Sequence, residues 1–116
     1  MACVGDAEKV QQVLINLLSN AAKFTRTGGM IFVDAERRGN DVLIHVRDTG
    51  IGIPHDKLAH IFEPFVQVDA AYTRTRDGIG LGLAISRDLA RGMHGELTVE
   101  STVGVGSTFT LRLPAA

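Results

Sequence analysis

Three polar residues in the first predicted helix have types and spacing that suit nucleotide chemistry. Asn16, Asn20 and Lys23 follow at intervals of four and three residues, so they share one stripe of the helix. An asparagine carbonyl is a hard oxygen ligand suited to Mg²⁺, and a lysine ammonium is a point charge suited to phosphate. A solvated stripe beside the apolar face explains the same pattern, so both interpretations stay open on these residues alone.

A carboxylate followed by glycines forms a second candidate. Asp48 ends a predicted strand just before Gly50 and Gly52. The carboxylate is an acceptor for the exocyclic amine of a base, and the glycines would let a planar base lie close against the backbone. In the alternative interpretation Asp48 is an ordinary turn residue whose carboxylate caps local N–H groups.

A glycine-rich loop precedes the second long predicted helix. Gly78, Gly80 and Gly82 alternate along the chain and lead into an apolar, helix-prone segment. Such a loop offers bare N–H groups and the positive end of a helix dipole to an anion such as phosphate. Glycine also relieves crowding at tight turns, so the spacing alone does not separate phosphate binding from packing.

The elements that must position these residues alternate between helix and strand. Helical spacing of apolar residues predicts a helix from Asp6, its N-cap, to Phe24. The other expected elements are strands at 30–37 and 41–48, a short helix at 55–61, a helix at 81–93, and strands at 96–101 and 108–113. This order predicts an α/β (α+β) two-layer sandwich, with helices on one face of a mixed, mostly antiparallel sheet. The stretch 62–80 has few periodic apolar positions and is expected to be an ordered loop or a lid.

Length and composition limit the classes of protein. The chain has 116 residues, 45% of them hydrophobic, which suits one domain with one core. Twelve basic residues against thirteen acidic ones give a net charge of -1, so no strong basic field favours nucleic acid. The single cysteine excludes an internal disulfide framework, and no apolar run has the length of a membrane span.

Four short motifs follow one another in order: NLLSNAAKFT at 16–25, DTGIGI at 48–53, FEPF at 62–65 and GIGLGLAISRDLA at 78–90. Together they resemble the N, G1, F and G2 boxes of the ATP-binding catalytic domain of sensor histidine kinases. The tail at 95–114 resembles the end of that domain, so the resemblance covers nearly the whole chain. It implies the Bergerat fold, a single domain over 1–116 that is a fragment of a longer chain, and an ATP lid at about 62–80.

The resemblance also implies cofactors and residue roles. ATP and Mg²⁺ are the expected cofactors, with Asn20 as the metal ligand, Asn16 beside it and Lys23 on phosphate. Asn16 and Lys23 are the expected catalytic residues. Asp48 is expected to bind the adenine amine and Thr108 to lie near the adenine. The other expected nucleotide contacts are Gly50, Gly52, Ile53, Gly78, Gly80, Leu81, Gly82 and Leu83.

Asn16 bears on the type of reaction. Related ATP hydrolases of the superfamily carry a glutamate general base at this position, because water must lose a proton to become a good nucleophile. An asparagine cannot take that proton, whereas a neutral imidazole already offers a lone pair. Asn16 is therefore consistent with a kinase rather than an ATPase, and the resemblance implies that the function is transfer of the γ-phosphoryl group to a histidine. Arg74 or Arg76 would add charge near the phosphate, although a solvated-loop role explains them as well.

Three other functions remain as alternatives. One is a pseudokinase that uses the nucleotide as a conformational ligand, and another is a serine kinase of the anti-sigma type on the same fold. A gyrase- or chaperone-type ATPase ranks lowest because of Asn16.

The resemblance places the phosphoaccepting histidine on a separate dimerising hairpin. None of the four histidines of this chain lies in such a segment. The expected partners are therefore that hairpin of the parent kinase and a response regulator receiver domain, with no nucleic acid and no direct membrane insertion. The fragment is expected to be monomeric and cytoplasmic. His94 and Asp77 stand where the family often has glycine.

Overall fold

The structure is a computed structural model that describes residues 6–25, 28–58, 60–63 and 82–115. Its elements in chain order are α1 (Ala7–Phe24), β1 (Ile31–Arg38), β2 (Asp41–Asp48), α2 (His55–Leu58), α4 (Gly82–Gly92), β3 (Glu96–Thr102) and β4 (Gly106–Pro114). The predicted lid lies outside the described residues except for Phe62 and Glu63.

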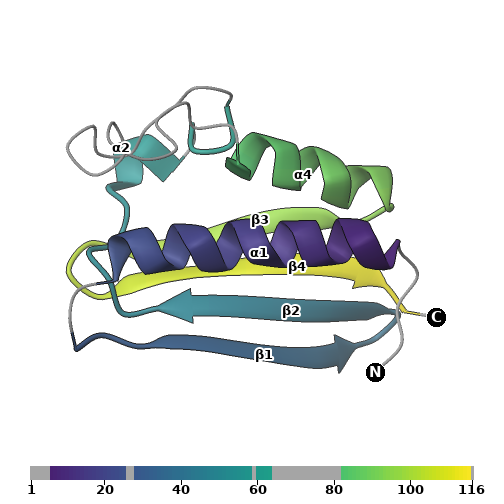
Figure 1. Cartoon of the computed structure of the whole chain (residues 1–116), viewed down its shortest axis with the longest axis horizontal. Coiled ribbons are helices and arrows are strands. Elements are labelled where there is room, and N and C mark those ends of the chain that lie inside the picture. Colours follow the sequence, from purple (N-terminus) through teal and green to yellow (C-terminus); the bar gives the residue numbers. More distant parts are fainter. Residues whose placement is uncertain (1–5, 26–27, 59, 64–81, 116) are drawn as a thin grey trace.

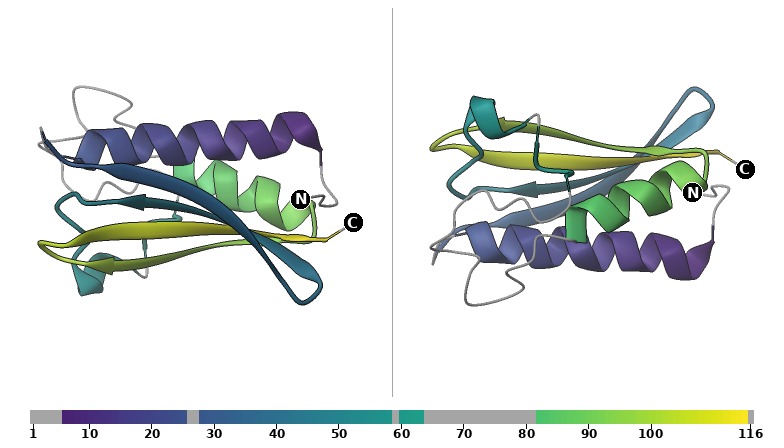
Figure 2. Two further views of the ribbon diagram at one scale, coloured as in Figure 1. Left: turned by 90° about the horizontal axis from the view of Figure 1, so that it is seen from below. Right: turned by 90° about the horizontal axis from the view of Figure 1, so that it is seen from above.

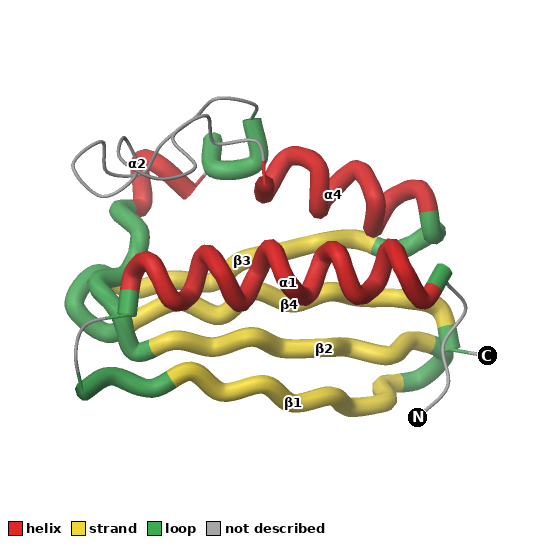
Figure 3. Tube along the Cα trace, viewed as in Figure 1, coloured by secondary structure: helices red, strands yellow, loops and turns green. Residues whose placement is uncertain are grey.

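The four strands form one sheet in the order β1-β2-β4-β3. All three strand pairings in the described part of the chain are antiparallel, so the parallel component of the expected mixed sheet is not found there. Helices α1 and α4 lie side by side on one face of the sheet (Figures 1 and 2). The predicted two-layer arrangement of helices over a sheet is therefore confirmed, as the trace in Figure 3 also shows.

Helix α1 forms because its local signals agree with its packing. The Asp6 side chain accepts hydrogen bonds from the backbone N–H groups of Glu8 and Lys9, at 2.9 and 3.4 Å, which confirms the predicted N-cap. Its buried positions recur at helical spacing, namely Val13, Leu17, Ala21 and Phe24. The exposed side of α1 is mostly polar but includes Ile15 and Leu18, and the buried stripe packs in the core.

The core lies between the two helices and alternate residues of the central strands. Val46 of β2 and Phe109, Leu111 and Leu113 of β4 are at most 1% exposed. Because side chains alternate across a strand, the even positions of β2 and the odd positions of β4 face the helices. This alternation decides which polar residues at the strand ends lie on the helix side.

The short helix was predicted too long. It was expected over 55–61, but α2 covers only His55–Leu58. Beyond it the chain continues in tight turns, with the Glu63 N–H donating to the His60 carbonyl at 3.0 Å. Ile61 is nonetheless 2% exposed, so its apolar character reflects burial in the core rather than helix formation.

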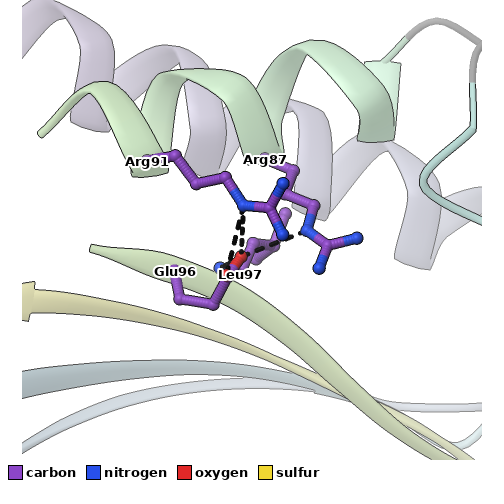
Figure 4. Close-up of polar contacts among 4 residues, drawn as sticks. All are labelled: Arg87, Arg91, Glu96 and Leu97. Atoms are coloured by element: carbon purple, nitrogen blue, oxygen red, sulfur yellow. Dashed lines mark hydrogen bonds and ion pairs between the residues drawn. The ribbon is translucent and has the colours of Figure 1, made fainter. Parts of the chain in front are cut away.

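Ion pairs join the last turns of α4 to the start of β3 (Figure 4). The Glu96 carboxylate accepts hydrogen bonds from Arg87 Nε at 3.1 Å and Arg91 Nε at 3.2 Å, and from the Leu97 N–H at 2.9 Å. Burial acts to raise the pKa of Glu96, but these hydrogen bonds outweigh it and hold that pKa below its ordinary value. The cluster fixes how α4 sits on the sheet.

Helix α4 ends in a Schellman motif that requires a left-handed residue. The N–H groups of Gly95 and His94 donate to the carbonyls of Ala90 and Arg91, at 2.8 and 3.1 Å. His94 has φ 64°, a conformation that glycine adopts without strain. This explains why a glycine would suit the position.

We expect His94→Gly to stabilise the domain by up to about 1 kcal/mol, because it removes the left-handed strain of a side chain at some cost in unfolded-state entropy. Chemical denaturation would measure the change in the free energy of unfolding. His94→Ala is the matched control, because it removes the imidazole but keeps the strain. Equal stability of the two variants would show that the conformation is not the cause.

Candidate functional site

Asn16 joins the two long helices. Its amide Nδ2 donates to Ser86 Oγ at 3.0 Å and to the Gly82 carbonyl at 3.4 Å, both on the first turns of α4. Ser86 is fully buried, and its hydroxyl donates to the Gly82 carbonyl at 2.7 Å. The Ser86 oxygen is thus left as an acceptor, and this sets the orientation of the Asn16 amide.

The carbonyl side of the Asn16 amide faces the other way. Asn16 Oδ1 accepts a hydrogen bond from Gln12 Nε2 at 3.1 Å and keeps one more lone pair. The structure therefore gives Asn16 a structural task, holding α4 against α1, in addition to the role expected from the sequence. Ser86 was missed there, although a serine at a core position of an apolar helix was a signal for it.

Asn20 and Lys23 continue the stripe toward the end of α1. Both are half-buried, and Lys23 lies in the last turn of the helix. Within the described part of the chain the side chain of Asn20 makes no hydrogen bond, so its carbonyl oxygen is available to a ligand. Asn16, the first residue of the stripe, lies on the side of α1 that contacts α4, and the ligand roles of Asn20 and Lys23 stay predictions.

Asp48 is a buried carboxylate at the end of β2. It is 4% exposed, lies on the helix side of the sheet, and accepts a hydrogen bond from the Gly50 N–H at 2.9 Å. The backbone N–H of Ser107 also hydrogen bonds to it. Burial raises the pKa of Asp48 above its ordinary value, and the two N–H groups offset part of that rise.

Gly50 and Gly52 have packing reasons to be glycine. A Cβ on Gly50 would overlap the carbonyl of Phe24 and lie 2.8 Å from Asp48 Oδ1. Gly52 has φ 76°, and a Cβ there would overlap the carbonyl of Thr102. Close approach of the chain itself accounts for both glycines, and their part in holding a base remains a prediction.

Thr108 does not lie beside Asp48. The β2–β4 register places Ser107 opposite Asp48 and Thr108 opposite Arg47. Since side chains alternate across a strand, Thr108 points to the sheet face away from the helices, whereas Ser107, 6% exposed, is on the Asp48 side. The placement of Thr108 near the Asp48 site is therefore corrected by one residue, to Ser107. Apolar residues at 109, 111 and 113 were a sequence signal for this phase.

Of the expected glycine-loop contacts, Gly82 and Leu83 are described, while Gly78, Gly80 and Leu81 lie outside the described residues. Gly82 begins α4 and is exposed, and a Cβ there would meet nothing within 4 Å. Crowding among the described residues therefore does not explain this glycine. Leu83 is half-buried and packs against the core.

The side chain of Ile53 is buried, and its backbone N–H is hydrogen bonded. The side chain is 4% exposed and belongs to the core, and the N–H donates to Ser101 Oγ at 2.7 Å.

In the described part of the chain no three His, Cys, Asp or Glu side chains form a group that could hold a metal ion. None of the described helices is long and apolar enough to span a membrane.

Several of these groups lie toward one end of the molecule. The C-terminal half of α1 and the ends of β2 and β3 lie at the left in Figure 1, and α4 begins nearest to that end. Hydrogen bonds join the parts, from the Ile51 N–H to the Phe24 carbonyl at 3.3 Å and from the Gly104 N–H to the Ile51 carbonyl at 2.9 Å. These bonds join the turn after Asp48 to the end of α1, the helix that carries Asn16, Asn20 and Lys23.

Comparison with known proteins decides the family. Residues 5–116 match the family described as "Histidine kinase-, DNA gyrase B-, and HSP90-like ATPase". The chain belongs to this ATPase family. The architecture is accordingly the α/β Bergerat fold, and the resemblance to histidine kinase catalytic domains is confirmed.

Individual proteins that are similar to this chain are histidine kinases. The circadian input-output histidine kinase CikA of Synechococcus elongatus is 46% identical over 109 residues, which are 94% of this chain and 14% of CikA. The solved mycobacterial sensor histidine kinase MprB has a TM-score of 0.85 at 29% identity, covering 97% of this chain and 76% of that one. Full-length ShkA in complex with AMPPNP has a TM-score of 0.80 at 38% identity, covering 93% of this chain and 22% of ShkA. The chain thus spans about a seventh of the curated relative CikA.

The raised pKa of Asp48 predicts a pH-dependent cost to folding. Below the unfolded-state pKa the group is protonated in both states and costs nothing; as pH rises through the raised folded-state pKa, the buried charge destabilises the fold. Relative to Asp48→Asn, wild-type stability should therefore fall with rising pH over a range above the usual one for aspartate. Denaturant unfolding of both proteins at a series of pH values, beginning at about 4, the ordinary pKa of aspartate, and rising past neutrality, measures this, and parallel curves would contradict it.

Proposed function

We propose that the chain binds Mg–ATP and donates the γ-phosphoryl group to a histidine on a separate dimerisation hairpin, as the catalytic domain of a two-component sensor histidine kinase. The observation that carries the proposal is the buried Asp48 carboxylate, which precedes a turn that hydrogen bonds to the end of α1, the helix that carries the polar stripe and joins α4 through Asn16. The histidine kinase relatives and the AMPPNP complex of ShkA support it.

In this proposal Asp48 recognises the base. An ionised carboxylate only accepts hydrogen bonds, so it pairs with the N6 amine of adenine and is repelled by the O6 carbonyl that guanine has at the same ring position. Ser107, opposite Asp48 in the ladder, is the neighbouring side chain on that side of the sheet. We assign to Ser107 the place near adenine that the sequence suggested for Thr108.

The phosphates would lie toward α1 and α4. The donor set fits Mg²⁺ that arrives with its nucleotide, because this ion is commonly held by one or two protein oxygens plus phosphate oxygens and water. Asn20 Oδ1 is the protein ligand in this proposal, and Mg²⁺ would neutralise part of the phosphate charge. Lys23 and the N-terminus of α4 at Gly82 supply further positive potential.

Transfer of the γ-phosphoryl group to a histidine depends more on positioning the two reactants than on a general base. A ring nitrogen of the acceptor histidine would attack the γ-phosphorus with its lone pair, and the bond to the β–γ bridging oxygen would break to release ADP. The amide of Asn16 accepts no proton, so hydrolysis by water lacks a base at this position. His45 is not a candidate acceptor, since it bonds Thr110 and Glu36 on the far face of the sheet.

The test is to mix the chain with the histidine-bearing hairpin of its parent kinase and γ-labelled ATP. Acid-labile label on the hairpin histidine, absent when that histidine is replaced, is the expected result. Nucleotide binding without labelling would favour a pseudokinase, and label on serine would favour an anti-sigma-type kinase. In the proposed setting the fragment is a cytoplasmic monomer whose parent passes the phosphoryl group to a response regulator.

A further inference from the structure

A row of polar residues crosses the sheet beside the candidate site. Asp48 of β2 stands opposite Ser107 of β4, and Ser107 stands opposite Ser101 of β3. All three lie on the helix side of the sheet. The next row inward is apolar throughout: Val46, Phe109 and Val99. The row therefore interrupts the core pattern at the level where the site begins.

Ser101 is the centre of the hydrogen bonds in this row. Its Oγ accepts from the Ile53 N–H at 2.7 Å, lies 3.0 Å from the Gly106 carbonyl and 2.7 Å from Ser107 Oγ. A hydroxyl has one proton and two lone pairs, so Ser101 uses all of them on these three partners. One side chain thus joins the turn after β2 to the start of β4.

Those two segments hold the carboxylate of Asp48. Its two backbone donors are Gly50, in the same turn as Ile53, and Ser107, next to Gly106. Any shift between the turn and the start of β4 would move one donor relative to the other and turn the carboxylate. The Gly104–Ile51 backbone bond also joins the two parts, but it lies at the tip of the hairpin.

We propose that Ser101 is a positioning residue for base recognition: its hydroxyl fixes the turn and Ser107 so that the Asp48 carboxylate presents its free lone pairs to the base. The inference rests on the proposed function, because it assigns Ser101 a part in the adenine preference of that same site. Ser101 itself need not touch the nucleotide.

The test is calorimetric titration of Mg–ATP and Mg–GTP into wild type, Ser101→Ala, Ser101→Thr and Thr98→Ala, with a thermal melt of each protein. Thr98 is the matched control, an exposed hydroxyl on the opposite face of β3. Ser101→Ala should weaken ATP binding about tenfold and GTP binding less than about threefold, since a mis-set hydrogen bond costs about that factor. Ser101→Thr should restore the ATP preference.

Each other outcome has a definite meaning. Equal losses for ATP and GTP in Ser101→Ala, or unchanged binding, would overturn the positioning role while leaving the proposed function intact. Failure of Ser101→Thr to restore the preference in a protein that melts normally would also overturn it. A wild type with no preference for ATP would overturn the proposed function itself, and with it the role of Ser101.

Discussion

Gly50→Ala is expected to destabilise the domain by about 3 kcal/mol or more and to abolish nucleotide binding in whatever remains folded. The added Cβ would overlap the carbonyl of Phe24, which is backbone and cannot rotate away, and would press on Asp48 Oδ1. The turn must then move away from the end of α1, which breaks the Ile51–Phe24 hydrogen bond and displaces the Asp48 carboxylate. For a domain stable by about 5–15 kcal/mol this is a large fraction of the total.

Thermal melting with and without nucleotide measures both effects. Gly92→Ala is the matched control, because a Cβ there meets nothing within 4 Å and Gly92 is the last residue of α4. We expect Gly92→Ala to melt within about 5 °C of wild type and Gly50→Ala to melt at least about 10 °C lower. A Gly50→Ala protein with normal melting and ATP binding would show that the turn is not packed as described.

Asn20→Ala is expected to reduce Mg²⁺-dependent ATP affinity by at least about tenfold, since even outer-shell changes at metal sites cost 10–100-fold. The reason is that Asn20 supplies the half-buried amide oxygen without another hydrogen-bond partner in the described chain. Titrations in Mg²⁺ and in EDTA separate the metal-dependent part. Ser19→Ala, an exposed neighbour on α1, is the control. An equal loss of ATP affinity in Mg²⁺ and in EDTA would show that Asn20 does not act as a metal ligand.

The local parts of the fold were predictable from the sequence. Helix α1 has an N-cap at Asp6 and apolar residues at helical spacing, and both signals act within one element. The two hairpins follow from alternating runs on either side of turn residues at 39–40 and 103–105. These elements depend on neighbours in the chain, so pattern alone places them to within a residue or two.

The contacts that build the site depend on residues far apart in the chain. The Asn16–Ser86 bond spans 70 positions, and the need for glycine at Gly50 arises from the Phe24 carbonyl. No local pattern contains that information. The expectation for Thr108 came from the family resemblance, and neighbouring residues of β4 lie on opposite faces of the sheet, so a difference of one position in that correspondence exchanges the faces.

The most direct test of the account is titration of Mg–ATP and Mg–GTP at neutral pH into wild type and Asp48→Asn. We predict a preference of the wild type for ATP of at least about tenfold, equivalent to about 1.4 kcal/mol, and its loss in Asp48→Asn, whose amide can also donate to guanine O6. Absence of ATP binding to the wild type, or an equal loss of both nucleotides in the variant, would contradict the assignment of Asp48 as the residue that recognises the base.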